Sequence, residues 1–191
     1  MTCKINAARE RTVQKGFLVR TICAMLLMKK NIIQLINNAN IQIIILITKL
    51  FNMNLSKNFT FNELIYSNSA DSYNIENKPG RIELENLKKL CNEILQPIRD
   101  KYGKSIYVNS GYRNPKVNRL VGGSSSSQHI KGEAADITVG TKEGNKKLFY
   151  IIVQMINNKE ITVGQLLDEK NYSWIHISLP YRKVNQILHL K

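Results

Sequence analysis

The chain has 191 residues, of which 43% are hydrophobic and 22% are charged. This composition is typical of a soluble protein with one domain of ordinary size, and it argues against disordered, collagen-like and Pro/Gly-rich classes. The cysteines, Cys3, Cys23 and Cys91, are too few and too scattered for a disulfide scaffold or a thiolate zinc site. The formal net charge of +14 predicts an anionic partner: nucleic acid, a membrane surface or an acidic cell-wall polymer.

The first quarter of the chain differs in composition from the remainder. Residues 1–50 contain eight Lys and Arg and one acid, so they carry half of the net charge. Two apolar runs, residues 21–28 and 41–47, are both much shorter than the roughly 20 residues that span a bilayer. No A-x-A-like site follows the first run, as a cleaved signal peptide requires. We expect residues 1–52 to be a basic, apolar extension, either a real anchor or a non-native start, and residues 53–191 to form the domain.

Helix signals recur along the predicted domain. They are a capping-box pair, apolar positions three or four residues apart, and proline at a first helical position. The expected helices begin near Thr60, span 83–95 with an end or a kink at Pro97, begin at Asn114-Pro115, and span 145–158. Residues 66–80 are polar and are expected to form a loop, as are the glycines and serines of 122–127.

Short runs rich in β-branched and aromatic residues predict strands. The expected strands are 106–108, 134–139, 163–167, 174–178 and 184–190. One helix is inserted between the second and third of these strands. The order predicts an α+β fold, with an antiparallel sheet and flanking helices.

Two histidines and one aspartate have positions that suit a metal site. His129 and Asp136 are seven residues apart, about 10.5 Å along a straight helix, which is too far to share one ion. Gly132 between them supplies a turn that can fold His129 back over Asp136. Period-two alternation puts Asp136 and His176 each on one face of a strand, so antiparallel neighbours would bring them together. Two imidazoles and one carboxylate leave a fourth position open, as in catalytic zinc sites.

The spacing by itself leaves other interpretations open. A lone histidine on a strand is most often a hydrogen-bonded structural residue, and a His–Asp pair is often an ordinary contact. His189, in the last predicted strand, is expected to be such a structural residue and not a metal ligand. Arg113, judged alone, suggests a surface ion pair.

Several motifs in a fixed order resemble one family of peptidases. They are Ser110-Gly111-Tyr112-Arg113-Asn114-Pro115, then Asn118, Gly122-Gly123, Ser127-x-His129-x-x-Gly132-x-Ala134-x-Asp136, and Trp174-x-His176-x-Ser178. This set resembles the zinc D-alanyl-D-alanine carboxypeptidase family (metallopeptidase family fifteen), and within it the phage and bacterial murein peptidases. The resemblance runs from about Asn54 to about Ser178 and leaves residues 1–52 without a counterpart.

The resemblance implies a hedgehog/DD-peptidase-like fold and a Zn2+ cofactor. The implied zinc ligands are His129, Asp136 and His176. Arg113 would bind the carboxylate of the substrate or polarise the scissile carbonyl, and its bidentate fork suits either role. Ser127 and Gln128 would line the substrate site.

The general base is the point at which this sequence departs from part of the family. Many relatives place an Asp or Glu three residues before the last histidine ligand, where this chain has Ser173, which cannot act as a base at neutral pH. The branch it resembles carries an acid at the end of the preceding strand, here Asp168-Glu169. One extra residue separates Glu169 from Trp174 relative to that pattern. We expect Glu169 to be the base, with Asp168 as the second choice; the other interpretation is that both are solvated loop acids.

The sequence therefore predicts zinc-dependent hydrolysis of peptide bonds in peptidoglycan stem peptides, by a D,D-carboxypeptidase or an endolysin-type endopeptidase. The missing acid at Ser173 keeps an alternative open, a non-catalytic wall-binding or structural module of the same fold. Nucleic acid is not expected as a partner, because half of the net charge lies in residues 1–50, outside the matched region. Membrane contact is expected only if residues 1–52 are a real anchor. We expect a monomer that acts on the cell wall, either exported or delivered by a phage.

Overall fold

The computed structural model describes residues 29, 34, 36–43, 53–181 and 184–189. The chain forms two compact units, residues 1–50 and 51–191, and each is described by itself. In the first unit residues 36–43 are helical and exposed, whereas the apolar run at 21–28 and the end of the second run, 44–47, lie outside the described residues. None of the described helices has the length and apolar character needed to cross a membrane. The division after residue 52 and an anchor role for residues 1–52 stay predictions.

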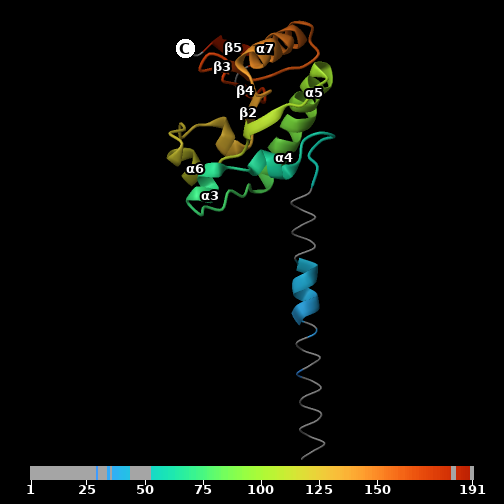
Figure 1. Cartoon of the computed structure of the whole chain (residues 1–191), viewed down its shortest axis with the longest axis vertical. Helices are drawn as coiled ribbons and strands as arrows, with labels where there is room; N and C mark the ends of the chain where they lie inside the picture. Colours follow the sequence, from blue (N-terminus) through green and yellow to red (C-terminus); the bar gives the residue numbers. More distant parts are fainter. Residues whose placement is uncertain (1–28, 30–33, 35, 44–52, 182–183, 190–191) are drawn as a thin grey trace, which may run out of the picture. The chain divides into compact units, whose positions relative to one another are not determined.

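The second unit is an α+β structure, which confirms the predicted fold class (Figure 1). Its helical segments are α2 (Phe61–Ile65), α3 (Asn68–Ser72), α4 (Arg81–Leu90), the π-helix η1 (Cys91–Leu95), α5 (Gln96–Tyr102), α6 (Pro115–Leu120), the 3-10 helix η2 (Gln128–Lys131) and α7 (Lys142–Asn157). Its strands are β1 (Tyr107–Ser110), β2 (Ala134–Thr138), β3 (Gln165–Glu169), β4 (Trp174–Ser178) and β5 (Gln186–His189). All five predicted strands are present; β4 has the predicted bounds, and the other four have shifted ends.

Side-chain caps begin the short helices that precede the sheet. The capping box of α2 is confirmed: Thr60 Oγ1 accepts the N–H of Glu63, and the Glu63 carboxylate accepts the N–H of Thr60 at 2.8 Å. The expected Asn114 cap of α6 is also present. The prediction of a loop over 66–80 is wrong in part, because Ser67 caps the additional helix α3 within it.

The helical run that begins with α4 does not end at Pro97. It widens into η1, where the N–H of Gln96 bonds to the carbonyl of Cys91, and it continues as α5 up to Gly103, which has a φ of 73°. Pro97 lies in the first turn of α5. Because proline has no N–H to donate, a widened turn just before it lets the run continue.

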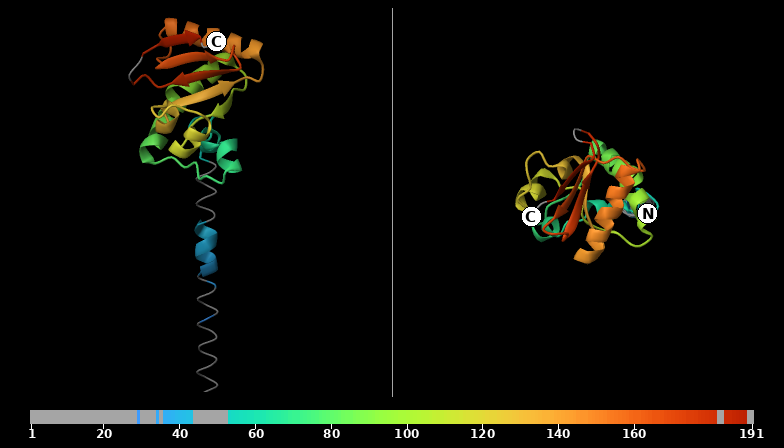
Figure 2. Two further views of the ribbon diagram at one scale, coloured as in Figure 1. Left: turned by 90° about the vertical axis from the view of Figure 1, so that its left-hand side faces the viewer. Right: turned by 90° about the horizontal axis from the view of Figure 1, so that it is seen from above.

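The five strands form one sheet in the order β1-β2-β4-β3-β5 (Figure 2). The pairs β1–β2, β2–β4 and β3–β4 are antiparallel, as expected. The edge strand β5 pairs with β3 in parallel. The predicted antiparallel arrangement is therefore wrong for β5, because an alternating pattern indicates the face that a residue takes and not the direction of its strand.

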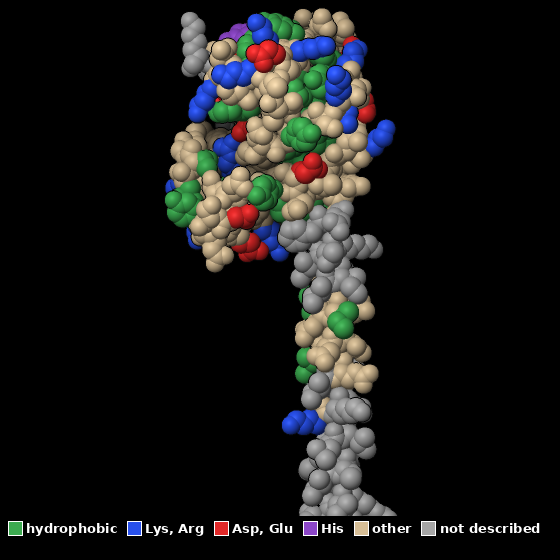
Figure 3. Space-filling model, in the orientation of Figure 1, with side chains coloured by type: hydrophobic (Ala, Val, Ile, Leu, Met, Phe, Trp, Pro, Cys, Tyr) green, Lys and Arg blue, Asp and Glu red, His purple; other side chains and the backbone are tan. Residues whose placement is uncertain are grey.

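The two faces of the sheet differ in chemistry. Ala135, Ile137, Ile175 and Ile177 are completely buried and belong to the main hydrophobic core together with apolar residues of α7, which lies along this face (Figure 2). Alternate residues of the same strands point to the opposite face, where the site described below lies. On the surface, Lys and Arg side chains are interspersed with Asp and Glu over the face drawn in Figure 3.

Candidate metal centre

A short turn positions His129. Ser127 Oγ accepts the N–H of His129 at 3.3 Å and begins η2, and Gly132 ends it in the left-handed region with a φ of 67°. A Cβ at Gly132 would also collide with the backbone of Glu83, so both the conformation and the space require glycine. The chain therefore turns at Gly132, as predicted, and His129 lies over β2.

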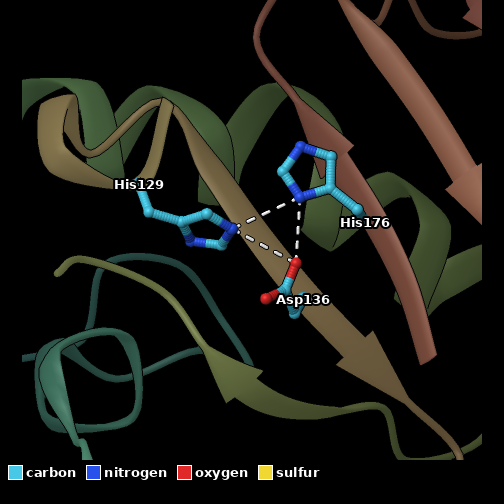
Figure 4. A group of neighbouring side chains, drawn as sticks. All are labelled: His129, Asp136 and His176. Atoms are coloured by element: carbon cyan, nitrogen blue, oxygen red, sulfur yellow. Dashed lines mark hydrogen bonds and ion pairs between the residues drawn. The ribbon is translucent and has the colours of Figure 1, made fainter. Parts of the chain in front are cut away.

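Strands β2 and β4 position the other two side chains. Asp136 and His176 are direct partners in the antiparallel register, which confirms the predicted pairing. Nε2 of His129 lies 3.2 Å from Oδ1 of Asp136 and 3.3 Å from Nδ1 of His176. Nδ1 of His176 lies 2.9 Å from the same Oδ1 (Figure 4). Three potential ligand atoms from buried side chains thus converge on one point.

The separations between these atoms suit a tetrahedral metal ion. Zinc binds histidine nitrogen and carboxylate oxygen at about 2.0–2.2 Å, which places the ligand atoms of a tetrahedron about 3.3 Å apart. The three observed separations, 2.9, 3.2 and 3.3 Å, lie close to this value. In the part of the chain that the structure describes, no other group of three His, Cys, Asp or Glu side chains converges in this way.

Hydrogen bonds on the outer sides of the two rings fix their tautomers. Nδ1 of His129 lies 2.7 Å from the carbonyl oxygen of Gly111, which only accepts, so Nδ1 carries the hydrogen and Nε2 keeps its lone pair. Nε2 of His176 likewise lies 3.1 Å from Oε1 of Gln128, which leaves the lone pair on Nδ1. Together with the carboxylate of Asp136, three lone-pair atoms face one another, an arrangement that a cation stabilises.

Arg113 lies against the carboxylate of the cluster. Its Nη2 donates to Oδ2 of Asp136 at 2.6 Å, and its Nε donates to Oγ of Ser110 at 2.7 Å. An irregularity in β1 between Val108 and Ser110 places Ser110 opposite Asp136 in the sheet. The guanidinium fork therefore orients the carboxylate so that Oδ1 faces the histidines, a contact that the sequence did not predict.

The surroundings keep Asp136 ionised. Burial by itself would raise the pKa of this carboxyl group. Protonated forms of His129 and then of His176, through their charge and hydrogen bonds, outweigh burial and hold the pKa of Asp136 well below its usual range, and a bound cation would act in the same direction. The group is therefore an anion at neutral and mildly acidic pH, as a carboxylate metal ligand must be.

The cluster lies in the wall of a cavity of about 620 Å3, which Glu169 and Trp174 also line. Glu169 pairs with Trp174 across β3 and β4, and Leu167 pairs with His176, so Glu169 shares the face of His176. Asp168 lies on the opposite face, where its Oδ2 is 3.1 Å from Nδ1 of His189. The structure brings Glu169 into the cavity with the three buried side chains and places Asp168 elsewhere.

The comparison with family models agrees with this geometry. Residues 57–178 match the model described as Peptidase M15. The chain belongs to the M15 peptidase family. M15 peptidases are zinc-dependent hydrolases, so membership and the converging side chains together support a metallopeptidase. No match was found among curated proteins. The resemblance drawn from the motifs is thus confirmed at the level of the family, and the phage and bacterial murein branch stays a prediction.

In this M15 peptidase the side chain of Gln128 has a role that the motifs do not reveal. Besides facing His176 with Oε1, it donates from Nε2 to Oγ of Ser178 at 2.9 Å, and the same Oγ accepts the N–H of Gln165 at 3.0 Å. These bonds hold the amide with its oxygen toward the ring. Ser127 lines the cavity of the cluster, whereas Gln128 lines a neighbouring one. Substrate contacts of both residues stay predictions.

Asn145 is another polar residue that supports the site, and none of the sequence motifs includes it. It is almost completely buried, and its Nδ2 donates to the carbonyl oxygens of Tyr172 and Ser173 at 2.9 and 3.0 Å. These bonds fix the turn between β3 and β4, which joins Glu169 to Trp174. A signal was present in the sequence, because Asn145 is in phase with the buried apolar positions of its helix, such as Leu148.

We expect Gln128→Leu to bind zinc about 10- to 100-fold more weakly than the unaltered chain, because His176 loses the acceptor that fixes its tautomer. Gln128→Glu keeps an acceptor at this position and should retain tight binding. Gln154→Leu, the same change at an exposed position of α7, is the matched control. Competition with a chromophoric chelator measures the affinity. Equal zinc affinity in the two leucine variants would contradict the assigned role of Gln128.

Proposed function

We propose that the protein is a zinc-dependent peptidase that hydrolyses peptide bonds in peptidoglycan stem peptides. The observation that carries this proposal is the convergence of His129, Asp136 and His176 at tetrahedral separations in the wall of a cavity that also contains Glu169. The three side chains are the proposed ligands of one Zn2+. Zinc, when bound, supplies Lewis-acid polarisation of the scissile carbonyl and lowers the pKa of a water molecule to about 7.

Glu169 is the proposed general base. A carboxylate on the face of His176 is suited to take a proton from the attacking water as the oxygen adds to the carbonyl carbon. Its carboxyl group then returns that proton to the leaving nitrogen when the C–N bond breaks. Asp168 is a poor base for this step, because it is buried on the opposite face beside His189.

Arg113 has two proposed functions. Its bond to Oδ2 of Asp136 holds the ligand carboxylate in place. The guanidinium also lines the cavity, where its positive charge would stabilise the negative charge that develops on the scissile carbonyl oxygen. Nη2 and Nε of Arg113 already donate hydrogen bonds to Asp136 and Ser110. The orienting function is therefore the better supported of the two.

The alternative function is a wall-binding or structural module without catalysis. It was suggested by the absence of an acid at Ser173, and the side chain of this residue donates to the carbonyl of Lys170 in the exposed turn. The presence of Glu169 in the cavity favours hydrolysis, because it supplies a carboxylate that Ser173 cannot.

Metal content and product analysis distinguish the two functions. We expect the purified full chain to hold about one zinc per molecule and to release new peptide fragments from purified peptidoglycan, detected by mass spectrometry. Zinc without new fragments would instead indicate the binding module. Chelation should stop fragment release, and added zinc should restore it. Masses of the fragments identify the bond that is cut, and so separate a carboxypeptidase from an endopeptidase.

A further inference from the structure

A second cavity adjoins the one that holds the metal centre. Its volume is about 550 Å3, within the range of cavities that bind small molecules or parts of larger ones. Ser127 and His176 line both cavities. The two cavities are therefore neighbours with Ser127 and His176 on their common border, so the second cavity offers space next to the metal centre.

The residues that line the second cavity all have polar or charged side chains, with one Lys and one Glu among them. The lining residues are Ser124, Ser126, Ser127, Gln128, Lys131, Glu133, Gln165, His176 and Tyr181. Hydroxyl and primary amide groups dominate this set, and both kinds of group donate and accept hydrogen bonds. An ion that moves here from water loses hydration, and only an excess of opposite charge in the lining would offset that loss. One Lys and one Glu provide no such excess. The lining favours an uncharged ligand rich in hydrogen-bonding groups.

Several of these groups are held in place before any ligand binds. The hydroxyl of Tyr181 donates to Oδ1 of Asn86 at 2.9 Å, and Nδ2 of the same Asn86 donates to the carbonyl of Lys131 at 2.8 Å. On the serine loop, the hydroxyls of Ser124 and Ser126 lie 3.0 Å apart. Preorganised walls reduce the entropy cost of binding.

The cationic residues that line the first cavity also bear on the length of the substrate. Among the residues that the structure describes, they are Arg113 and Lys170. Arg113 is bonded to Asp136, and Nζ of Lys170 lies 5.2 Å from the ring centroid of Trp174. A substrate that ends just after the scissile bond presents a terminal carboxylate, which a cation without another partner binds most strongly. The second cavity instead provides hydrogen-bonding space for a chain that continues.

We propose that the second cavity is a substrate subsite for an uncharged, amide-bearing segment, so that this peptidase takes substrates extending on both sides of the scissile bond. The inference rests on the proposed function for its substrate class. Amides of this kind come either from further peptide residues or from the N-acetyl groups of the attached sugars, and both sources offer the same chemistry to the lining.

Fluorescence of Trp174 provides a test, because it is the single tryptophan of the chain and lines the first cavity. Binding to the zinc-loaded full chain is measured by stopped flow, before turnover. The probes are a free stem pentapeptide, the same pentapeptide carrying its disaccharide, and a cross-linked dimer of stem peptides. Ser126→Tyr places a bulky ring at the second cavity without adding tryptophan, and Ser105→Tyr makes the same change at an exposed position outside both cavities.

We expect at least one extended probe to bind about tenfold more tightly than the free pentapeptide, a difference of about 1.4 kcal/mol. Ser126→Tyr should remove this gain and leave pentapeptide binding unchanged, and Ser105→Tyr should preserve it. A gain for the disaccharide probe identifies sugar amides as the ligand, and a gain for the dimer identifies peptide amides. Equal binding of all three probes, or a gain that survives Ser126→Tyr, would overturn the subsite.

The proposed function and the subsite fail in different ways. Fragment release without any preference for extended probes would support the proposed peptidase function and contradict the proposed subsite. A preference abolished by Ser126→Tyr, without fragment release, would support the subsite in a protein that binds peptidoglycan without cutting it. Absence of binding by all three probes would overturn both.

Discussion

His176→Ala is expected to lose its zinc and its peptidase activity together. The substitution removes Nδ1, one of three atoms that lie 2.9–3.3 Å from one another, and leaves two protein ligands. Because loss of an outer hydrogen-bond partner alone costs about 10- to 100-fold in metal affinity, loss of a ligand should weaken binding by more than about 100-fold. His129→Ala should behave in the same way, because it removes the opposing Nε2. Metal analysis of the purified proteins and chelator competition measure the effect.

The third histidine supplies a matched control. The side chain of His189 is 57% exposed, and it pairs with Asp168 on the face of the sheet that carries the core. His189→Ala should therefore bind zinc with the affinity of the unaltered chain. A full zinc equivalent in both His129→Ala and His176→Ala would contradict the ligand assignment. A large loss in His189→Ala would mean that the wrong histidine had been chosen.

The alternation of side chains along strands explains why the centre of the site could be predicted from the sequence. Asp136 and His176 lie 40 residues apart, but each has apolar neighbours on both sides that must face the core. Once two such strands pair, the polar residues share the other face, and their register is set by the need to bury the apolar ones. Gly132 was similarly predictable, because a return of the chain toward β2 needs a left-handed residue.

The supporting hydrogen bonds were not predictable in the same way. Gln128 is next to His129 in the sequence, yet its side chain bonds to His176, 48 residues away, because the turn of η2 directs the two side chains to different partners. Arg113 donates to Asp136 and to Ser110, and an irregularity in β1 places Ser110 opposite Asp136 in the sheet. Such contacts depend on the positions of three or more segments at once. A pattern within one segment therefore indicates the residues of a site more readily than their partners.

The turn between β3 and β4 raises the same difficulty for the general base. Lys170, Asn171 and Tyr172 all have positive φ, between 47° and 60°, so the chain reverses through three consecutive left-handed residues. This conformation is costly for residues other than glycine and persists only when the surroundings hold it, here through the side chain of Asn145. Sequence spacing could not decide whether Asp168 or Glu169 faces the metal centre. The register of β3 with β4 places Glu169 on that face.

Glu169→Gln is accordingly expected to lower the turnover of peptidoglycan peptides by about 10²- to 10⁴-fold, the usual contribution of a positioned base. Glutamine has nearly the same shape, but its amide cannot take a proton from water at neutral pH. Zinc content should stay at that of the unaltered chain, because Glu169 is not one of the three converging side chains proposed as ligands. Turnover, metal content and melting temperature are measured on the same preparations.

Asp168→Asn is the matched comparison, one residue away on the other face. It weakens the charged contact between Asp168 and His189 and should lower the melting temperature, while turnover per folded molecule stays near that of the unaltered chain. The reverse pattern, with Glu169→Gln active and Asp168→Asn inactive at full zinc content, would identify Asp168 as the general base instead of Glu169. If both variants keep their turnover, the proton is taken by a group other than these two acids. A loss of zinc in Glu169→Gln would assign this side chain to the metal site in place of proton transfer.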